Sequence, residues 1–161
     1  MPHTDISIAS KIVLVTGGGS GINLSFVKLV LQAGAKGIII ADLKLTDEAQ
    51  KLVDEIPQLV FQQCDVTKRQ DLEKSIQVSI TSFNDVPDIY VAGAGVFEPA
   101  WSNWWDDTED DRYAELDINV THALKLSRTA MRALLSKEKQ GVILIVASLA
   151  GFTVRNPFVR A

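Results

Sequence analysis

A glycine-rich segment near the start of the chain, Thr16-Gly-Gly-Gly-Ser-Gly-Ile22, has the composition of a phosphate-binding turn. It follows an apolar run and precedes a segment with helical periodicity. Glycine permits positive φ and a close approach of the backbone to a ligand. The N–H groups and the dipole at the start of a helix attract a pyrophosphate. We therefore expect phosphate binding at Gly17 and Gly21, with the Ser20 hydroxyl as a further donor. The alternative is an ordinary tight turn between a strand and a helix.

A carboxylate at the end of the next apolar run suggests which nucleotide such a turn would hold. Asp42 follows Gly37–Ala41. An acidic side chain at this place accepts hydrogen bonds from ribose 2′- and 3′-hydroxyls and repels a 2′-phosphate. No Arg or Lys lies in the glycine turn or directly after Asp42. The pattern predicts NAD rather than NADP, and the alternative is a plain aspartate at a strand end.

Short apolar runs alternate along the chain with segments of helical periodicity. Strands are expected at Ile12–Val15, Gly37–Ala41, Leu59–Gln63, Ile89–Ala92 and Val142–Val146, and helices at Ile22–Ala33, Asp47–Ile56, Lys68–Phe83 and within Asp110–Ser136. The first helix would bury Phe26, Leu29, Val30 and Ala33. This alternation is typical of βαβ units, and continuously apolar strands suit a sheet covered on both faces. The sequence predicts an α/β fold, a Rossmann-like doubly wound parallel sheet of strand order 3-2-1-4-5.

Composition excludes several classes of protein. The 161 residues carry a net charge of −4 and no basic run, which argues against nucleic-acid binding. No apolar stretch approaches the length of a membrane span, and the first residues lack the features of a signal peptide. A lone cysteine, Cys64, excludes an internal disulfide and suits a reducing compartment, so we expect a cytoplasmic protein.

We expect no metal site, because His122 is predicted on a helix surface and the acidic run 106–111 suits the start of a helix. A tryptophan cluster could line a substrate pocket or could equally pack in the core or against another subunit: Trp101, Trp104 and Trp105.

Together with the glycine turn, four further motifs resemble those of the short-chain dehydrogenase/reductase family, in register from Lys11 to Gly151. They are Cys64-Asp65-Val66-Thr67, Asp88-Ile-Tyr-Val-Ala-Gly-Ala-Gly95, Asp117-Ile-Asn-Val120 and Ala147-Ser-Leu-Ala-Gly151. Within the family, the chain looks similar to 15-hydroxyprostaglandin dehydrogenase-like proteins of fungal type.

The resemblance implies a set of site residues and partners. Ser148 would bind the substrate oxygen and Asn119 would order a water in a proton relay. The substrate would be a small-molecule alcohol or ketone, and the protein a homo-oligomer, most simply a dimer. NAD would be bound by Gly17, Ser20, Gly21, Ile22, Asp42, Leu43, Asp65, Val66 and Gly93.

The chain departs from the family pattern in three places. Asn23 replaces the last glycine of the turn, and Ala92-Gly93 replaces a common Asn-Asn pair. The third departure is the family's Tyr-x-x-x-Lys motif, which should follow the Ser segment. Only ten residues follow Gly151, and none is Tyr, Lys or His. The two tyrosines, Tyr90 and Tyr113, lie elsewhere, and neither has a Lys at the fourth position after it.

This last departure predicts a loss of chemistry. In the family, the Tyr exchanges a proton with the substrate, and general acid–base catalysis needs such a group within hydrogen-bonding reach. We therefore expect a single dinucleotide-binding domain spanning 1–161, truncated after its fifth strand, whose redox activity is lost or vestigial. The alternatives are a non-catalytic pseudoenzyme or interaction protein, and a repurposed enzyme that uses the old pocket for non-redox chemistry.

Overall fold

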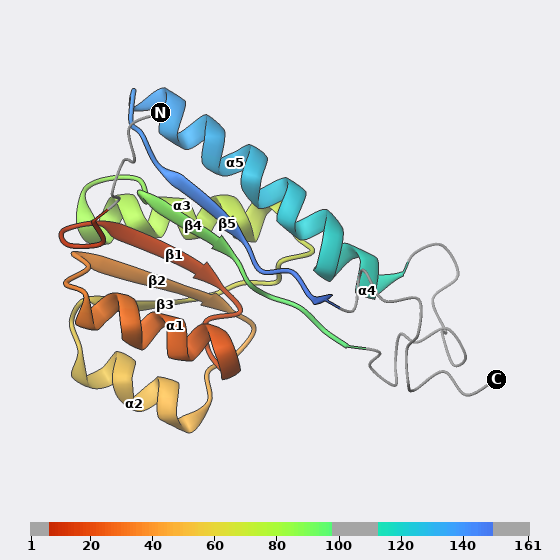
Figure 1. The fold of residues 1–161 in the computed structure, drawn as a ribbon, viewed down its shortest axis with the longest axis horizontal. Coiled ribbons are helices and arrows are strands. Elements are labelled where there is room, and N and C mark those ends of the chain that lie inside the picture. Colours follow the sequence, from red (N-terminus) through yellow and green to blue (C-terminus); the bar gives the residue numbers. More distant parts are fainter. Residues whose placement is uncertain (1–6, 98–112, 150–161) are drawn as a thin grey trace.

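A five-stranded parallel sheet forms the centre of the molecule (Figure 1). The computed structural model describes residues 7–97 and 113–149. The strands are β1 (Ile12–Thr16), β2 (Gly37–Asp42), β3 (Leu59–Gln63), β4 (Ile89–Ala92) and β5 (Val142–Ile145). They are ordered β3-β2-β1-β4-β5, and every neighbouring pair is parallel. The predicted fold and strand order are thus confirmed.

Helices cover both faces of the sheet. They are α1 (Gly21–Gln32), α2 (Asp47–Glu55), α3 (Arg69–Phe83), the short α4 (Ala114–Leu116) and α5 (His122–Ser136). Alternate residues of the central strands face opposite sides. Val13 and Ile38 pack with Val27 of α1, whereas Leu14 packs with Leu126 of α5. Burial on both sides explains why the strands are continuously apolar rather than alternating.

The buried face of α1 differs from the predicted one. The helix buries Leu24, Val27 and Val30, whereas Leu29 is 62% exposed. Apolar residues occur all around this helix, so periodicity alone did not determine its rotation. Contact with the sheet selected the stripe that meets Val13 and Ile38.

The predicted long helix is interrupted. A π-helical turn at Asp117–Thr121 joins α4 to α5, and residues 110–112 lie outside the described part of the chain. Beyond it, α5 buries His122 and Leu126 against the sheet, so the prediction that His122 lies on a helix surface is wrong. No helix among the described residues is long and apolar enough to cross a membrane.

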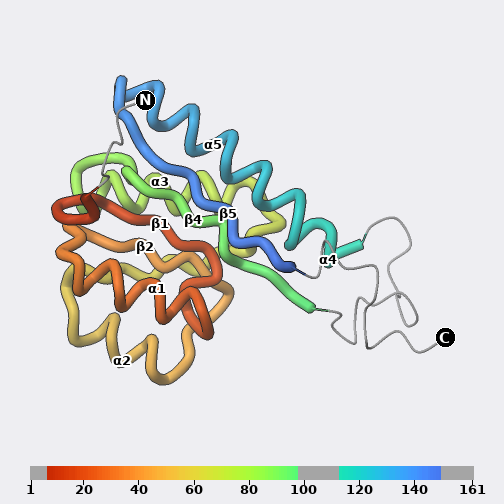
Figure 2. The backbone as a smooth tube through the Cα atoms, viewed as in Figure 1, coloured from red at the N-terminus to blue at the C-terminus, as the bar shows by residue number. Residues whose placement is uncertain are grey.

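The strand β5 lies at one edge of the described sheet. Its backbone runs beside β4, as the trace in Figure 2 shows. It ends at Ile145, one residue earlier than predicted, although the Val146 N–H still donates to the Ala92 carbonyl at 3.0 Å. The side chains of Leu144, Ile145 and Val146 are exposed.

Candidate functional site

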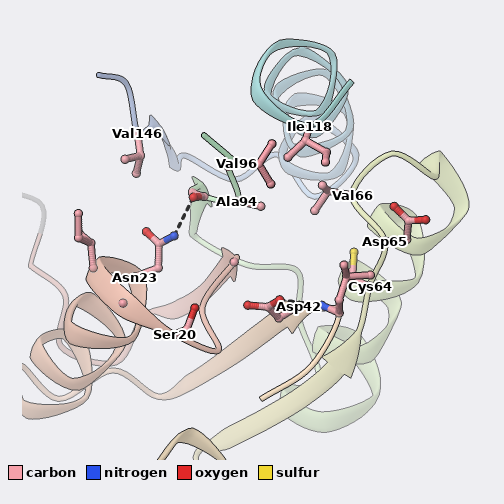
Figure 3. Close-up of a pocket in the computed structure, with 16 residues that line it drawn as sticks. Ser20, Asn23, Asp42, Cys64, Asp65, Val66, Ala94, Val96, Ile118 and Val146 are labelled. Carbon is pink, nitrogen blue, oxygen red and sulfur yellow. Dashed lines mark hydrogen bonds between the residues drawn. The ribbon is translucent and has the colours of Figure 1, made fainter. Parts of the chain in front are cut away.

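A cavity of about 520 Å³ lies at the carboxyl edge of the sheet, where the segments after β1, β2, β3 and β4 meet (Figure 3). All of the predicted cofactor-binding residues line it: Gly17, Ser20, Gly21, Ile22, Asp42, Leu43, Asp65, Val66 and Gly93. The structure therefore brings together residues that were predicted separately along the sequence. It adds Asn23, Cys64, Ala94, Gly95, Val96, Ile118 and Val146.

The glycine turn lies between β1 and α1, as predicted. Gly17 and Gly21 adopt φ of +71° and +56°, a region that strongly favours glycine. A Cβ on Gly17 would lie 2.7 Å from the Cα of Ala94, so the turn also packs tightly on the segment after β4.

The start of α1 is left open toward the cavity. Its N-cap, Ser20, makes no side-chain capping hydrogen bond, and its first turn holds no acidic residue. In contrast, Thr46 caps α2, whose first turn contains Asp47 and Glu48. First-turn N–H groups have no partner within a helix. Those of α1 can therefore serve a bound anion.

Two backbone hydrogen bonds hold the carboxylate of Asp42 in place. Its Oδ2 accepts from the Gly19 N–H at 2.9 Å, and its Oδ1 accepts from the Leu43 N–H at 2.7 Å. The hydroxyl of Thr46 donates to the Gly19 carbonyl at 2.9 Å, so the glycine turn is fastened on both sides. Each carboxylate oxygen keeps further acceptor capacity for a ligand.

Asp65 lies on the wall formed by the segment after β3. Its Oδ1 accepts from both the N–H and the hydroxyl of Thr67, at 3.1 and 2.7 Å. Burial by itself would raise the pKa of Asp65, but the Thr67 hydrogen bonds and the Lys68 ammonium lower it below its usual value. Asp65 is therefore a fixed negative charge at this wall.

Cys64 lies beside Asp65 and is fully buried. Burial raises the pKa of its thiol to about 11. Because the thiolate is the reactive form of cysteine, this thiol is poorly suited to redox chemistry at neutral pH.

A buried histidine supports the cavity from behind, a role the sequence reasoning missed. His122 is 1% exposed. Its Nε2 lies 3.0 Å from the Thr16 hydroxyl, and its Nδ1 lies 3.1 Å from the Ile118 carbonyl. The same hydroxyl accepts from the Gly93 N–H at 3.0 Å. His122 thus connects the first residue of the glycine turn with the π-helical turn. The spacing of His122 from Leu126 and Ala130, four and eight residues on, is a sequence signal for its burial on the same helix face.

Neither of the two predicted catalytic residues lines the cavity. Asn119 lies in the π-helical turn, and its amide is paired with the Val96 backbone: Oδ1 accepts from the N–H at 2.9 Å and Nδ2 donates to the carbonyl at 2.8 Å. π-Helical turns often occur at functional sites. Ser148 is an exposed residue that follows the end of β5. Their catalytic roles stay predictions.

No tyrosine or lysine of this chain lines the cavity. Every one of them lies within the described residues, and none appears in its wall. Tyr90 is fully buried in β4, and Tyr113 lies directly before α4. Among the described residues, no group of three or more His, Cys, Asp or Glu could hold a metal ion. The tryptophan cluster and the acidic run lie outside the described part of the chain.

Comparison with known proteins decides the family. The family model described as short chain dehydrogenase matches residues 11–160. The chain belongs to this family. The resemblance of the motifs is therefore confirmed at the family level.

Relatives and solved structures agree with this assignment. L-Fucose dehydrogenase from Bos taurus is 32% identical over 146 residues, which cover 89% of this chain and 51% of the relative. A short-chain type dehydrogenase/reductase from Mycobacterium marinum superimposes with a TM-score of 0.79 at 24% identity, covering 94% of this chain and 61% of that one. A short-chain dehydrogenase/reductase from Burkholderia phymatum, solved in complex with NAD, gives a TM-score of 0.78 at 19% identity, covering 93% and 53%. These two structural matches establish the fold alone.

The chain spans about half the length of the curated relatives it matches. It covers 51%, 43% and 55% of three of them.

Proposed function

We propose that this chain is a single dinucleotide-binding domain that takes NAD(H), from an oxidoreductase acting on an alcohol or ketone. The observation that carries the proposal is the convergence of all the predicted cofactor residues on one cavity, with the Asp42 carboxylate fixed inside it. NAD would supply the hydride chemistry that these residues cannot perform themselves.

The cavity fits such a cofactor in three respects. The uncapped start of α1 offers N–H groups to a diphosphate. Asp42 offers acceptors to ribose hydroxyls. Ile22 and Leu43 are apolar yet 81% and 61% exposed beside the cavity, and a bound dinucleotide would cover them.

We propose NAD rather than NADP because of charge. A 2′-phosphate would approach the Asp42 carboxylate, whose two oxygens are tied to the backbone and cannot easily turn away. The residue after it is Leu43, which offers no positive charge to offset the repulsion.

We expect the 161-residue chain to bind NAD(H) without turning over an alcohol or ketone. No Tyr or Lys lines the cavity, and Asn119 and Ser148 alone provide no group that exchanges a proton near neutral pH. A dehydrogenase reaction at this cavity therefore needs a proton-transfer group from outside these residues. Within the family, we propose the 15-hydroxyprostaglandin dehydrogenase-like subgroup.

The test combines binding and turnover. Purified protein is titrated with NADH and NADPH by fluorescence and calorimetry, and turnover is then measured with simple alcohols and ketones. Binding that is selective for NADH, even if weak, without turnover supports the proposal. Absence of dinucleotide binding refutes it, and turnover lost on Ser148→Ala would show that the chain is a complete catalyst.

Self-association is a further part of the proposal. Exposed apolar residues recur along one side of the helical segment 116–135, at spacings of four and seven residues: Leu116, Val120, Leu124, Met131 and Leu135. A stripe of this kind is typical of a contact between protein surfaces, so we propose a homo-oligomer, most simply a two-fold dimer.

A further inference from the structure

Asn23 joins the start of α1 to the segment that follows β4. It is the third residue of the helix, and its Nδ2 donates to the Gly93 carbonyl at 2.7 Å (Figure 3). The two residues are 70 positions apart in the chain. Both line the cavity.

The side chain of Asn23 occupies the space that a side chain on residue 93 would need. A Cβ on Gly93 would lie 2.5 Å from the Asn23 Oδ1 and 2.7 Å from its Cγ. Atoms at such distances overlap, so a side chain at position 93 requires the Asn23 amide to move and to give up its hydrogen bond to the Gly93 carbonyl. A glycine at position 23 would in turn leave the Gly93 carbonyl without its donor.

Two of the departures from the family pattern therefore meet in space. The chain has Asn where the glycine turn ends in Gly, and Gly where the strand-four motif has the second Asn of a pair. The Asn23 amide thus contacts the residue at which the family pattern has the second Asn of its pair.

The hydrogen bond from Asn23 helps to fix the backbone of the cavity wall at Gly93. The Thr16 hydroxyl accepts from the Gly93 N–H at 3.0 Å while Asn23 donates to the Gly93 carbonyl, so this residue is held at both polar groups. Within the described residues, Asn23 makes no other side-chain hydrogen bond. Its Oδ1 and its second N–H are thus available to a ligand beside the uncapped start of α1.

The position of Asn23 indicates which part of a ligand it would meet. In Figure 3, Asn23 and Val146 lie on one side of the cavity and Asp65 on the other, with Asp42 between them. Asp42 suits the ribose of the adenosine. Asn23 then faces the part of the dinucleotide beyond the adenylate.

We propose that Asn23 and Gly93 form a coupled pair that positions the diphosphate and nicotinamide half of the cofactor. The identity of the ligand rests on the proposed function, whereas the coupling of the two residues does not. Loss of either partner displaces the wall after β4, and restoring an amide at position 93 with glycine at 23 recovers it.

A double-mutant cycle tests this inference. Asn23→Gly, Gly93→Asn and the double variant are compared with the unmodified chain by melting temperature without ligand and by affinity for NADH and for AMP. Each single variant should weaken NADH binding by about 3- to 10-fold, the effect of one net hydrogen bond. The double variant should recover most of that loss and most of the melting temperature, and AMP affinity should change little in all of them.

Two substitutions that each add a carboxylate to α1 provide a control that does not depend on glycine in a helix. Asn23→Asp places a carboxylate in the cavity wall and should weaken NADH binding more than Asn23→Gly does. Ser25→Asp places the same charge on the same helix, where Ser25 does not line the cavity, and should leave NADH affinity close to that of the unmodified chain.

Several outcomes would overturn the inference. Additive losses in the double variant would show that the two residues are independent. Equal losses of NADH and AMP affinity would show a general structural effect instead of positioning. If the unmodified chain binds neither nucleotide, the proposed function and the positioning role fail together, and the ligand-free melting temperatures still report on the coupling.

Discussion

Asp42→Asn is the substitution whose effect the structure defines most closely. Both carboxylate oxygens accept backbone hydrogen bonds, from Gly19 at 2.9 Å and from Leu43 at 2.7 Å. An asparagine has the same shape, but one of its two terminal atoms is an amide nitrogen. Whichever way it turns, this nitrogen faces a backbone N–H, and two donors oppose each other.

The magnitude follows from these two contacts. The Gly19 N–H is partly buried whereas the Leu43 N–H is exposed, so the amide nitrogen should turn toward Leu43, whose N–H can bond to water instead. We therefore expect a loss of stability of about 1 kcal/mol, at the low end of the cost of an unpaired donor. Separately, loss of the negative charge that accepts hydrogen bonds from the ribose hydroxyls should weaken NADH binding by about 1–3 kcal/mol, or about 5- to 150-fold. NADPH affinity should fall less than NADH affinity or should rise, because the repulsion of the 2′-phosphate disappears.

The assay is a pair of fluorescence titrations, with NADH and NADPH, together with urea unfolding. Asp54→Asn is a matched control, because Asp54 is an exposed aspartate of α2 that does not line the cavity. An unchanged ratio of NADH to NADPH affinity in Asp42→Asn would refute the role given to this carboxylate. An unchanged free energy of unfolding would refute the argument that the new amide nitrogen faces a backbone N–H unfavourably.

Three further predictions concern the scaffold. Tyr90→Phe should leave the free energy of unfolding unchanged or raise it by about 1 kcal/mol, because the buried hydroxyl has no hydrogen-bond partner in the described structure; a clear loss in urea unfolding would contradict this. Burial lowers the pKa of His122, so as the pH drops the imidazole is protonated in the unfolded chain before it is protonated in the folded one, and the free energy of unfolding should fall below about pH 6.5. In His122→Gln, chemical unfolding over a pH series should show a shallower fall. An identical dependence on pH in both proteins would exclude His122 as the cause. The chain should self-associate through the exposed apolar stripe of segment 116–135, and Leu124→Lys should reduce this in light scattering; a monodisperse unmodified monomer would contradict it.

Several features of the fold and the cavity followed from local sequence. Continuous apolar runs such as Gly37–Ala41 indicated buried strands, and the observed β2 extends this run by one residue. The glycines at 17 and 21 indicated positive φ at the start of a helix, which the structure shows. These features depend on neighbouring residues alone, so the pattern of the sequence was sufficient to predict them.

Other features depend on contacts between distant segments. The burial of His122, the exposure of Leu29 and the π-helical turn at Asn119 arise when helices dock on the sheet. The pairing of Asn23 with Gly93 needs the strands to be ordered and aligned first. The sequence by itself thus indicated nine of the sixteen residues that line the cavity, through its motifs and the places where strands end. Only the tertiary structure decided how side chains pair across it, because steric fit and hydrogen bonding between distant segments leave no periodic signal in the chain.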